Sequence, residues 1–181
     1  MSKIEQFKIS LGKNHLKSRL KAFKRKSTFY NFENAKTAGI LFCCPDDASY
    51  EAIKEFMSFL KVKNIDVKAL CYYPGKKIPD KFLFHNNLEF FSDEDLNWYY
   101  KPKNETINQF IDKRFDLFFD LNINEYFPAL FISSLSNASF KVGMEKKENT
   151  DKDLMINIDK TKTVSYLIEQ IKHYLSLINK S

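Results

Sequence analysis

A chain of 181 residues that is 44% hydrophobic and 15% aromatic, with 4 Gly and 5 Pro, can form one domain around a substantial core. No apolar run reaches the roughly 18 residues needed to span a bilayer, and the charged N-terminus does not resemble a secretory signal. Three cysteines, two of them adjacent, exclude a disulfide framework and favour a reduced, cytoplasmic setting.

The positive charge is concentrated in the first part of the chain. Residues 1–27 hold nine lysine and arginine residues and one acid, a balance of +8, whereas the remaining residues hold 20 cations and 22 acids, a balance of −2. A basic segment on a nearly neutral body is typical of a protein that contacts an anionic partner.

Residues 3–26 have the pattern of one helix, or of two helices separated near Gly12. Apolar residues recur at helical spacing in two narrow stripes, and lysine and arginine occupy the other faces. The stripes are Leu16, Leu20 and Phe23, with Ile4, Phe7 and Leu11 upstream. Residues 27–36 follow as a linker with aromatic residues that can dock on the domain. Residues 1–36 are therefore expected to form a basic helical arm and linker.

From residue 37 onward, strands and helices are expected to alternate. The apolar runs that we expect to be strands are residues 37–44, 66–73, 88–91, 117–121, 140–143 and 153–158. The clearest helical periodicity is at residues 163–178. This order predicts an α/β fold, a Rossmann-like three-layer sandwich with a mostly parallel sheet of about five strands. Residues 37–181 would form a single α/β domain.

In such folds ligands bind beyond the carboxyl ends of the strands, where polar residues follow two of the expected strands. These residues are Asp46, Asp47, Asp120, Asn122 and Glu125. The turn CCPDDAS has no glycine to let a phosphate approach its backbone, and its aspartates are better explained as helix caps. Asp120 and Glu125 are either an acid–base pair or turn residues. This rim is a candidate small-molecule site.

The cysteines and histidines give no firm chemistry. Cys43 and Cys44 lack the spacing of a redox or zinc pair, and Cys71 lies on a different strand, so all three are interpreted as buried strand residues. Nothing in the sequence places a histidine beside them. We predict no catalytic residue, no metal and no cofactor.

Two further segments allow a functional interpretation. Trp98, Tyr99 and Tyr100, followed by Lys101 and Lys103, either pack against the core or stack on a base or partner. Residues 144–152, MEKKENTDK, are expected to form a charged solvent loop.

The pattern FDLFFDLNINEYFPALFISSLSNASFKVG, followed by DLMINI and YLIEQIKHYLSLINK, resembles an uncharacterised bacterial domain family. In that family a basic N-terminal helix precedes a small α/β domain, and the resemblance implies no particular activity. It covers most of the chain, including AKTAGILF and DLNWYYKPKN.

Residues 115–143 are also similar to part of the first domain of heptosyltransferase-type glycosyltransferases. There a D-L-hydrophobic-hydrophobic-D-L strand leads into a helix, an L-S-x-A segment and a strand that ends in glycine. The matching residues here are Asp116, Leu117, Asp120, Leu121, Leu135, Ser136, Ala138 and Gly143. This similarity implies a glycosyltransferase-like use of the rim.

Our leading hypothesis is a non-enzymatic cytoplasmic binding protein whose arm contacts RNA or a ribonucleoprotein. Lysine outnumbers arginine seven to two in residues 1–27, which favours phosphate contact over base reading. The expected phosphate-binding residues are Lys13, Lys17, Arg19, Lys21, Lys24, Arg25 and Lys26. An acidic protein or an anionic membrane surface is an alternative partner. The alternative functions are a small glycosyltransferase-like enzyme or small-molecule-binding domain that uses the rim, and a protein-interaction module.

Overall fold

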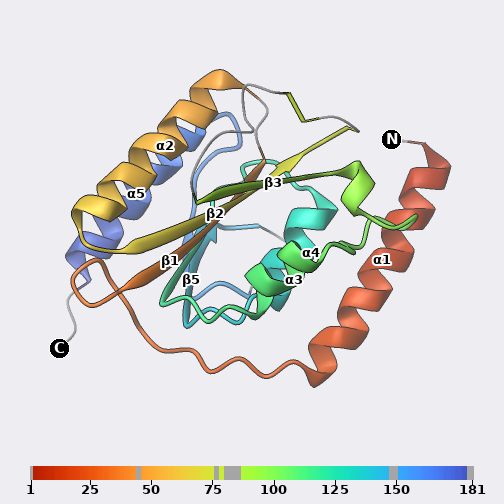
Figure 1. The fold of residues 1–181 in the computed structure, drawn as a ribbon, viewed down its shortest axis with the longest axis horizontal. Helices are drawn as coiled ribbons and strands as arrows, with labels where there is room; N and C mark the ends of the chain where they lie inside the picture. Colours follow the sequence, from red (N-terminus) through yellow and green to blue (C-terminus); the bar gives the residue numbers. More distant parts are fainter. Residues whose placement is uncertain (1, 44–45, 76–77, 80–86, 147–150, 179–181) are drawn as a thin grey trace.

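The computed structural model describes residues 2–43, 46–75, 78–79, 87–146 and 151–178. Within these residues the centre of the fold is a sheet of six strands, in which each strand is parallel to its neighbours (Figure 1). The strands are β1 (Thr37–Cys43), β2 (Asp66–Tyr73), β3 (Leu88–Ser92), β4 (Leu117–Asp120), β5 (Phe140–Met144) and β6 (Leu154–Ile156). The helices are α1 (Lys3–Ala22), α2 (Asp47–Val62), η2 (Asp93–Asp95), α3 (Glu105–Asp112), α4 (Phe127–Leu135) and α5 (Val164–Leu177).

The strand order is β3-β2-β1-β4-β5-β6. The chain builds the sheet outward from β1 in one direction, then returns to place β4 on the other side of β1. Ala38 pairs with Leu117 and Leu41 pairs with Asp120 at this junction. Such a reversal creates a crevice at the carboxyl ends of the two central strands, which is where open α/β sheets bind ligands. The prediction of an α/β sandwich with a mostly parallel sheet is confirmed.

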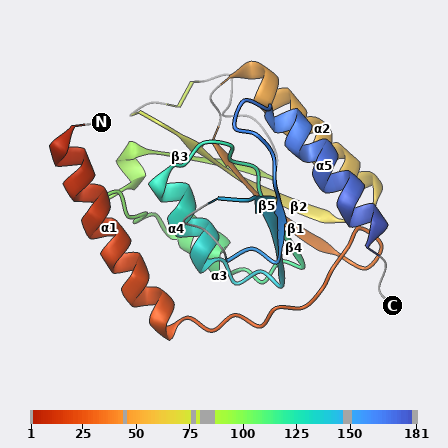
Figure 2. The same cartoon turned by 180° about the vertical axis from the view of Figure 1, so that it is seen from behind.

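Helices cover both faces of the sheet. Helices α2 and α5 lie side by side on one face, and α3 and α4 lie on the other face with α1 outside them (Figures 1 and 2). Two apolar cores result, one on each face, with Phe42 and Phe56 in the first and Phe118 and Phe131 in the second. Because β4 is buried along its whole length, it carries the continuous apolar run expected of a parallel strand covered on both sides.

Helix α1 is one continuous helix, so the alternative of two helices separated near Gly12 is wrong. Its first turn is closed by a capping box between Ser2 and Glu5. Gly12 faces α4, and a Cβ atom there would lie 2.5 Å from the Phe127 ring and 2.7 Å from the carbonyl oxygen of Tyr99. The glycine thus lets the helix approach the body closely instead of interrupting it.

The face by which α1 docks agrees in part with the downstream predicted stripe and departs from the upstream one. Leu16 is buried and Ile9 packs against the second core, whereas Ile4 and Phe7 are 69% and 62% exposed. Phe23 packs against the second core, as its stripe predicts, whereas Leu20 is 37% exposed. Close approach at Gly12 sets this face, and apolar spacing alone does not reveal it.

The linker after α1 also lies against the body, as predicted. Phe32 is buried in the first core, and the Phe29 ring packs edge-on against Phe140 with centroids 5.2 Å apart. The backbone N–H of Thr28 donates to the carbonyl of Ser139 at 3.0 Å. The linker is therefore attached to the body near β5, whereas α1 packs against α4.

Candidate functional site

The carboxyl end of β4 carries a buried ion pair. The Asp120 side chain is 3% exposed, and its Oδ2 lies 3.0 Å from Nζ of Lys152, whose side chain has no exposed surface. Burial alone would raise the pKa of Asp120, but the charges of Lys152 and Lys146 and a hydrogen bond from Asn122 hold that pKa well below its usual range. Asp120 is therefore a permanent carboxylate that positions the rim and is not a proton donor.

Lys152 corrects the prediction of a charged solvent loop at residues 144–152. Met144 is the buried last residue of β5, and Lys152 points inward beside Gly143. A Cβ atom on Gly143 would lie 2.6 Å from Cε of Lys152, so the glycine provides the space that the lysine fills. The buried carboxylate of Asp120 requires such a counter-charge, because an unpaired buried charge is costly. Residues 147–150 lie outside the described part of the chain.

Asn122 is held by the same carboxylate and is 3% exposed. Its backbone N–H and its Nδ2 donate to Oδ1 of Asp120 at 3.2 Å and 2.7 Å, and Nδ2 also approaches the carbonyl of Leu41 at 3.4 Å. Both neighbours of Nδ2 are acceptors, which fixes the orientation of the amide. The other amide atom, Oδ1, is buried and has no hydrogen-bond partner in the described part of the chain.

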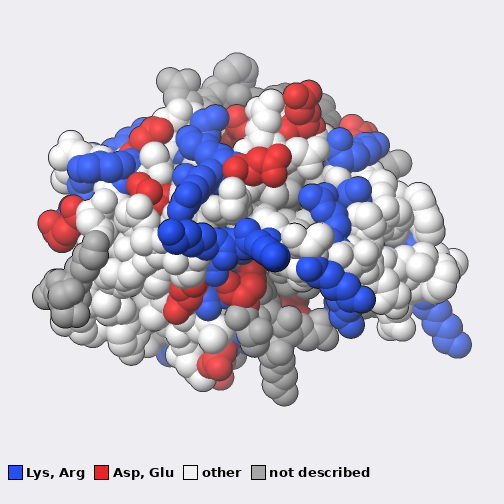
Figure 3. Space-filling view, turned by 90° about the horizontal axis from the view of Figure 1, so that it is seen from below, with Lys and Arg blue, Asp and Glu red and all other residues white. Residues whose placement is uncertain are grey.

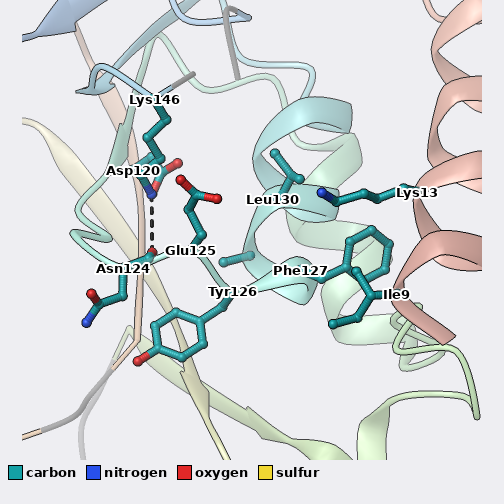
Figure 4. A pocket seen from close by; sticks show the side chains of 10 residues that line it. Ile9, Lys13, Asp120, Asn124, Glu125, Tyr126, Phe127, Leu130 and Lys146 are labelled. Atoms are coloured by element: carbon teal, nitrogen blue, oxygen red, sulfur yellow. Dashed lines mark hydrogen bonds between the residues drawn. The ribbon is translucent and has the colours of Figure 1, made fainter. Parts of the chain in front are cut away.

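A hollow lies on each side of the segment that follows Asn122. One, of about 350 Å³, is a crevice between the N-terminal ends of α2 and α5. The other, of about 170 Å³, lies between this segment, α4 and α1. In Figure 4 Lys13 reaches from α1 toward Leu130, and Glu125 lies beside Lys146, whose Nζ donates to the carbonyl of Asn124 at 3.3 Å. Helix α1 therefore forms one wall of the second hollow.

The other predicted rim residues have ordinary roles. Asp46 is the N-cap of α2 and accepts a hydrogen bond from the backbone N–H of Ser49 at 2.7 Å, which confirms its interpretation as a cap. Asp47 lies in the first turn of α2, where a negative charge is favoured. Glu125 is exposed, and its Oε1 is 3.6 Å from Nζ of Lys160. Asp46 and Asn122 both line the crevice, whereas Asp120 and Glu125 line the other hollow.

The predicted phosphate-binding residues divide into three groups. Five are exposed and make no ion pair with any described residue: Lys17, Arg19, Lys21, Lys24 and Lys26. Lys13 lines the hollow between α1 and α4. Arg25 is engaged within the protein. Lysine and arginine side chains form a band across the face seen in Figure 3, which looks from below at the side where the linker runs in Figure 1.

Arg25 fixes the linker to the body. Its guanidinium forms a two-pronged pair with the carboxylate of Asp153, at 2.8 Å and 3.0 Å, and donates to the carbonyls of Ala138 and Ser139 at 3.2 Å and 3.1 Å. The Arg25 side chain is only 14% exposed. Burial would raise the pKa of Asp153, but hydrogen bonds from Arg25 and Ser27 lower it. We therefore leave Arg25 out of the set that is free to bind phosphate.

Helix α1 meets the aromatic segment at residues 97–103. His15 lies between Tyr99 and Phe131, with ring centroids 6.0 Å and 6.2 Å away. Burial lowers the pKa of His15, and the nearby charges of Lys101 and Arg19 lower it further. Tyr99 and Tyr100 are partly buried, as their interpretation as packing residues requires, whereas Trp98 is 62% exposed.

A polar groove of about 320 Å³ lies at this junction. It is lined by Arg19 of α1 together with Asn97, Lys101, Pro102, Lys103 and Asn108 of the body. Three cations from segments about 80 residues apart thus border one hollow. Lys101 and Lys103 follow the aromatic residues in the sequence, whereas Arg19 reaches the groove only because α1 docks on the body.

Among the described residues no cluster of histidine, cysteine and acidic side chains could hold a metal ion. Cys43 and Cys71 are buried and are not joined in a disulfide, and their burial is as predicted for strand residues. Cys44 and His85 lie outside the described residues. In the described part of the chain, no helix has both the length and the apolar character needed to span a bilayer.

Comparison with known families finds one match. A model described as a family of unknown function (DUF6913) matches residues 8–178, which include most of α1 and the whole described sheet. No curated protein and no solved structure matches the chain.

Proposed function

We propose that this chain, which belongs to DUF6913, a family of unknown function, binds RNA through α1 and the adjoining groove. The observation that carries this proposal is the groove itself, where Arg19 of the arm lies with Lys101 and Lys103 of the body. Three cations around one hollow give a concentrated positive site for phosphate groups, and a docked helix holds it in place.

The surroundings of the groove extend the interface. Lys17, Lys21, Lys24 and Lys26 are exposed on the same segment of chain and make no ion pair among the described residues. They can neutralise phosphates along a backbone. Because lysine dominates, this contact would be largely independent of sequence.

Trp98 supplies a second kind of contact. Its ring is 62% exposed and immediately follows Asn97, which lines the groove. An exposed indole beside lysines is suited to stacking on an unpaired base, which contributes about 1–3 kcal/mol per base. Structured RNA with a loop offers both a phosphate backbone and unstacked bases. This combination favours RNA over an acidic protein or a membrane surface as the partner.

The test is a titration of the full chain with a fluorescently labelled RNA hairpin at several salt concentrations. With about seven phosphates neutralised by these cations, log K should fall with log salt at a slope of about −5 to −6. The double variant Arg19→Gln/Lys101→Gln should make the slope less steep by about 1.5 and weaken binding about tenfold or more at low salt. Trp98→Ala should weaken binding without changing the slope.

The matched control removes the same charge elsewhere. Lys61 and Lys68 are exposed on α2 and β2, away from the groove, and Lys61→Gln/Lys68→Gln lowers the net charge by the same two units. Its binding should stay close to that of the wild type. Binding that is flat with salt, or that both double variants weaken equally, would overturn the proposal.

Sugar transfer, a bacterial source and a cytoplasmic location remain predictions from sequence. The similarity of residues 115–143 to heptosyltransferase-type enzymes concerns the strand and helix that border the rim. The buried, charged state of Asp120 makes it unsuitable as a general acid at that rim. A binding role therefore suits the rim better than acid catalysis does.

A further inference from the structure

The crevice between α2 and α5 lies at the reversal of strand order, directly beyond β1 and β4. It has a volume of about 350 Å³ and includes Asp46, Asn122, Lys160, Lys162, Thr163 and Ser165 in its lining. This face of the molecule is separate from the groove between α1 and residues 97–103. A ligand here would not depend on the proposed RNA interface.

The two helices present opposite charge to the crevice. At α2 the cap residue is Asp46, so its N-terminus carries a carboxylate. At α5 the cap is Thr163, whose Oγ1 accepts from the backbone N–H of Tyr166 at 3.2 Å, and the first turn contains no acid. The N–H groups of Val164 and Ser165 remain at the helix end, where the helix dipole attracts an anion.

Two lysines strengthen the anionic preference of the α5 side. Lys160 and Lys162 precede the cap, and both line the crevice. Lys160 is 69% exposed in its side chain, and its one ion pair with a described residue is a long one to Glu125 at 3.6 Å, so it remains available to a ligand. A phosphate at this end would meet backbone N–H groups and two ammonium groups.

Asn122 is an independent observation that points to a ligand. It is 3% exposed and lines the crevice, and its amide oxygen is buried and has no hydrogen-bond partner among the described residues. The amide cannot turn over without placing Oδ1 against Oδ1 of Asp120 and the carbonyl of Leu41. Because buried polar atoms are almost always satisfied, this fixed acceptor calls for a donor such as a ligand hydroxyl.

We propose that the crevice binds a small phosphorylated sugar or polyol. The phosphate would occupy the N-terminus of α5 beside Lys160 and Lys162. A hydroxyl group of the ligand would donate to Oδ1 of Asn122, on the side of the crevice that Asp46 makes acidic. The carboxylate of Asp46 at the N-terminus of α2 explains why the phosphate would bind at α5. The turn before α2 also lacks a glycine that would let a phosphate approach the backbone.

The test uses the full chain, labelled with ¹⁵N, titrated with ribose 5-phosphate and glucose 6-phosphate in NMR experiments. Ribose, glucose and inorganic phosphate are the matched probes. The sugar phosphates should shift the resonances of residues 122–126 and 160–166, and the Asn122 side-chain amide in particular. They should bind at least about tenfold more tightly than either half alone, since each half makes only part of the contacts.

Two variants separate binding from folding. Ser165 is exposed in the first turn of α5, so Ser165→Glu places a carboxylate where the phosphate would lie while favouring the helix. It should abolish binding and leave thermal stability equal or higher. Lys160→Gln/Lys162→Gln should weaken binding about tenfold, and Lys61→Gln/Lys68→Gln should not change it.

Several outcomes would overturn the proposal. If the Ser165→Glu variant binds the sugar phosphates as tightly as the wild type, the phosphate does not bind at the N-terminus of α5. If inorganic phosphate binds as tightly as the sugar phosphates, the sugar hydroxyl makes no favourable contact with Asn122. Shifts confined to Arg19 and residues 97–103 would show that the sugar phosphates bind in the RNA groove instead. If neither sugar phosphate causes any shift, the crevice does not bind this class of ligand. RNA binding is measured separately, so each proposal can fail alone.

Discussion

The Nζ atom of Lys141 lies 2.7 Å from the carbonyl oxygen of Ser133, so a buried lysine on β5 closes the last turn of α4. Nζ also donates to the carbonyl of Ser134 at 3.1 Å and to Oδ2 of Asp151 at 3.2 Å. A cation is favoured at this end of a helix. Burial nevertheless lowers the pKa of Lys141 to about 8, with Asp151 opposing the shift.

This pKa predicts a pH dependence that Lys141→Met removes. Between pH about 8 and about 10.4 the unfolded chain binds a proton that the folded chain has released. The free energy of unfolding of the wild type, relative to the variant, should therefore rise through this range, by up to about 3 kcal/mol. Below pH about 8 the relative stability should stay constant, because Lys141 is then protonated in both states. Urea unfolding of both proteins at a series of pH values measures this difference in the free energy of unfolding.

The control for this prediction is an exposed lysine. Lys61→Met removes the same group from the surface of α2 and should keep a constant difference from the wild type over the whole range. A Lys141→Met variant whose difference is equally flat would contradict a depressed pKa at Lys141.

Breaking the buried ion pair between Asp120 and Lys152 should strongly lower the free energy of unfolding. Asp120→Asn leaves the Lys152 ammonium buried without a counter-charge and should lower the free energy of unfolding by about 3–5 kcal/mol. Asp120→Asn/Lys152→Met removes both charges and should recover most of that loss. Denaturant unfolding of both variants measures the coupling, and a double variant as unstable as the single one would contradict it.

The same pair predicts the direction of the acid response. Because the folded-state pKa of Asp120 is well below the unfolded value of about 3.9, its contribution is complete above that pH. The contribution is lost as pH falls below about 3.9 toward the folded-state pKa. The stability gap between the wild type and Asp120→Asn should therefore narrow below pH about 4.

Gly12 predicts how firmly α1 is docked. In a helix interior, alanine is normally more stabilising than glycine by about 1 kcal/mol. At position 12, however, the added Cβ would meet the Phe127 ring and the backbone oxygen of Tyr99. Gly12→Ala should therefore release α1 from the body and speed hydrogen exchange of the following linker. Ser18→Ala, an exposed change on the same helix, should leave exchange unchanged. RNA affinity should fall only in Gly12→Ala, which separates Arg19 from Lys101.

The fold could be read from the sequence because each central strand is a continuous apolar run bounded by polar turns. The run at residues 117–121 is one example, and β4 is buried as that pattern requires. The caps were equally readable, since Asp46 precedes an apolar helical period and does cap α2. These signals are local, so one sequence contains them.

The candidate sites depend on contacts that no local pattern contains. Lys152 lies in a run of charged residues, and only the buried Asp120 and the space beside Gly143 show why it turns inward. The docking face of α1 follows a close approach at Gly12 and includes only part of the apolar stripes, chiefly Leu16 and Phe23. The groove exists only because that docking brings Arg19 to Lys101.

Arg25 and Lys26 are neighbours that should respond in opposite ways. Arg25→Gln breaks a two-pronged pair with Asp153 and leaves the carbonyls of Ala138 and Ser139 without their donor. It should lower the free energy of unfolding by about 2 kcal/mol. Lys26→Gln changes the charge equally but removes an exposed side chain, so its effect on stability should stay within about 0.5 kcal/mol.

RNA binding should reverse this order. Lys26→Gln should make the slope of log K against log salt less steep by about 0.7–0.9, because one phosphate contact is lost. Arg25→Gln should leave the slope unchanged at a temperature where the variant is folded, because its guanidinium is already bound to Asp153. Unfolding curves and hairpin titrations on the same two variants test both halves. Equal salt slopes for the two variants would mean that the internal pairing of Arg25 does not decide which cations reach the RNA.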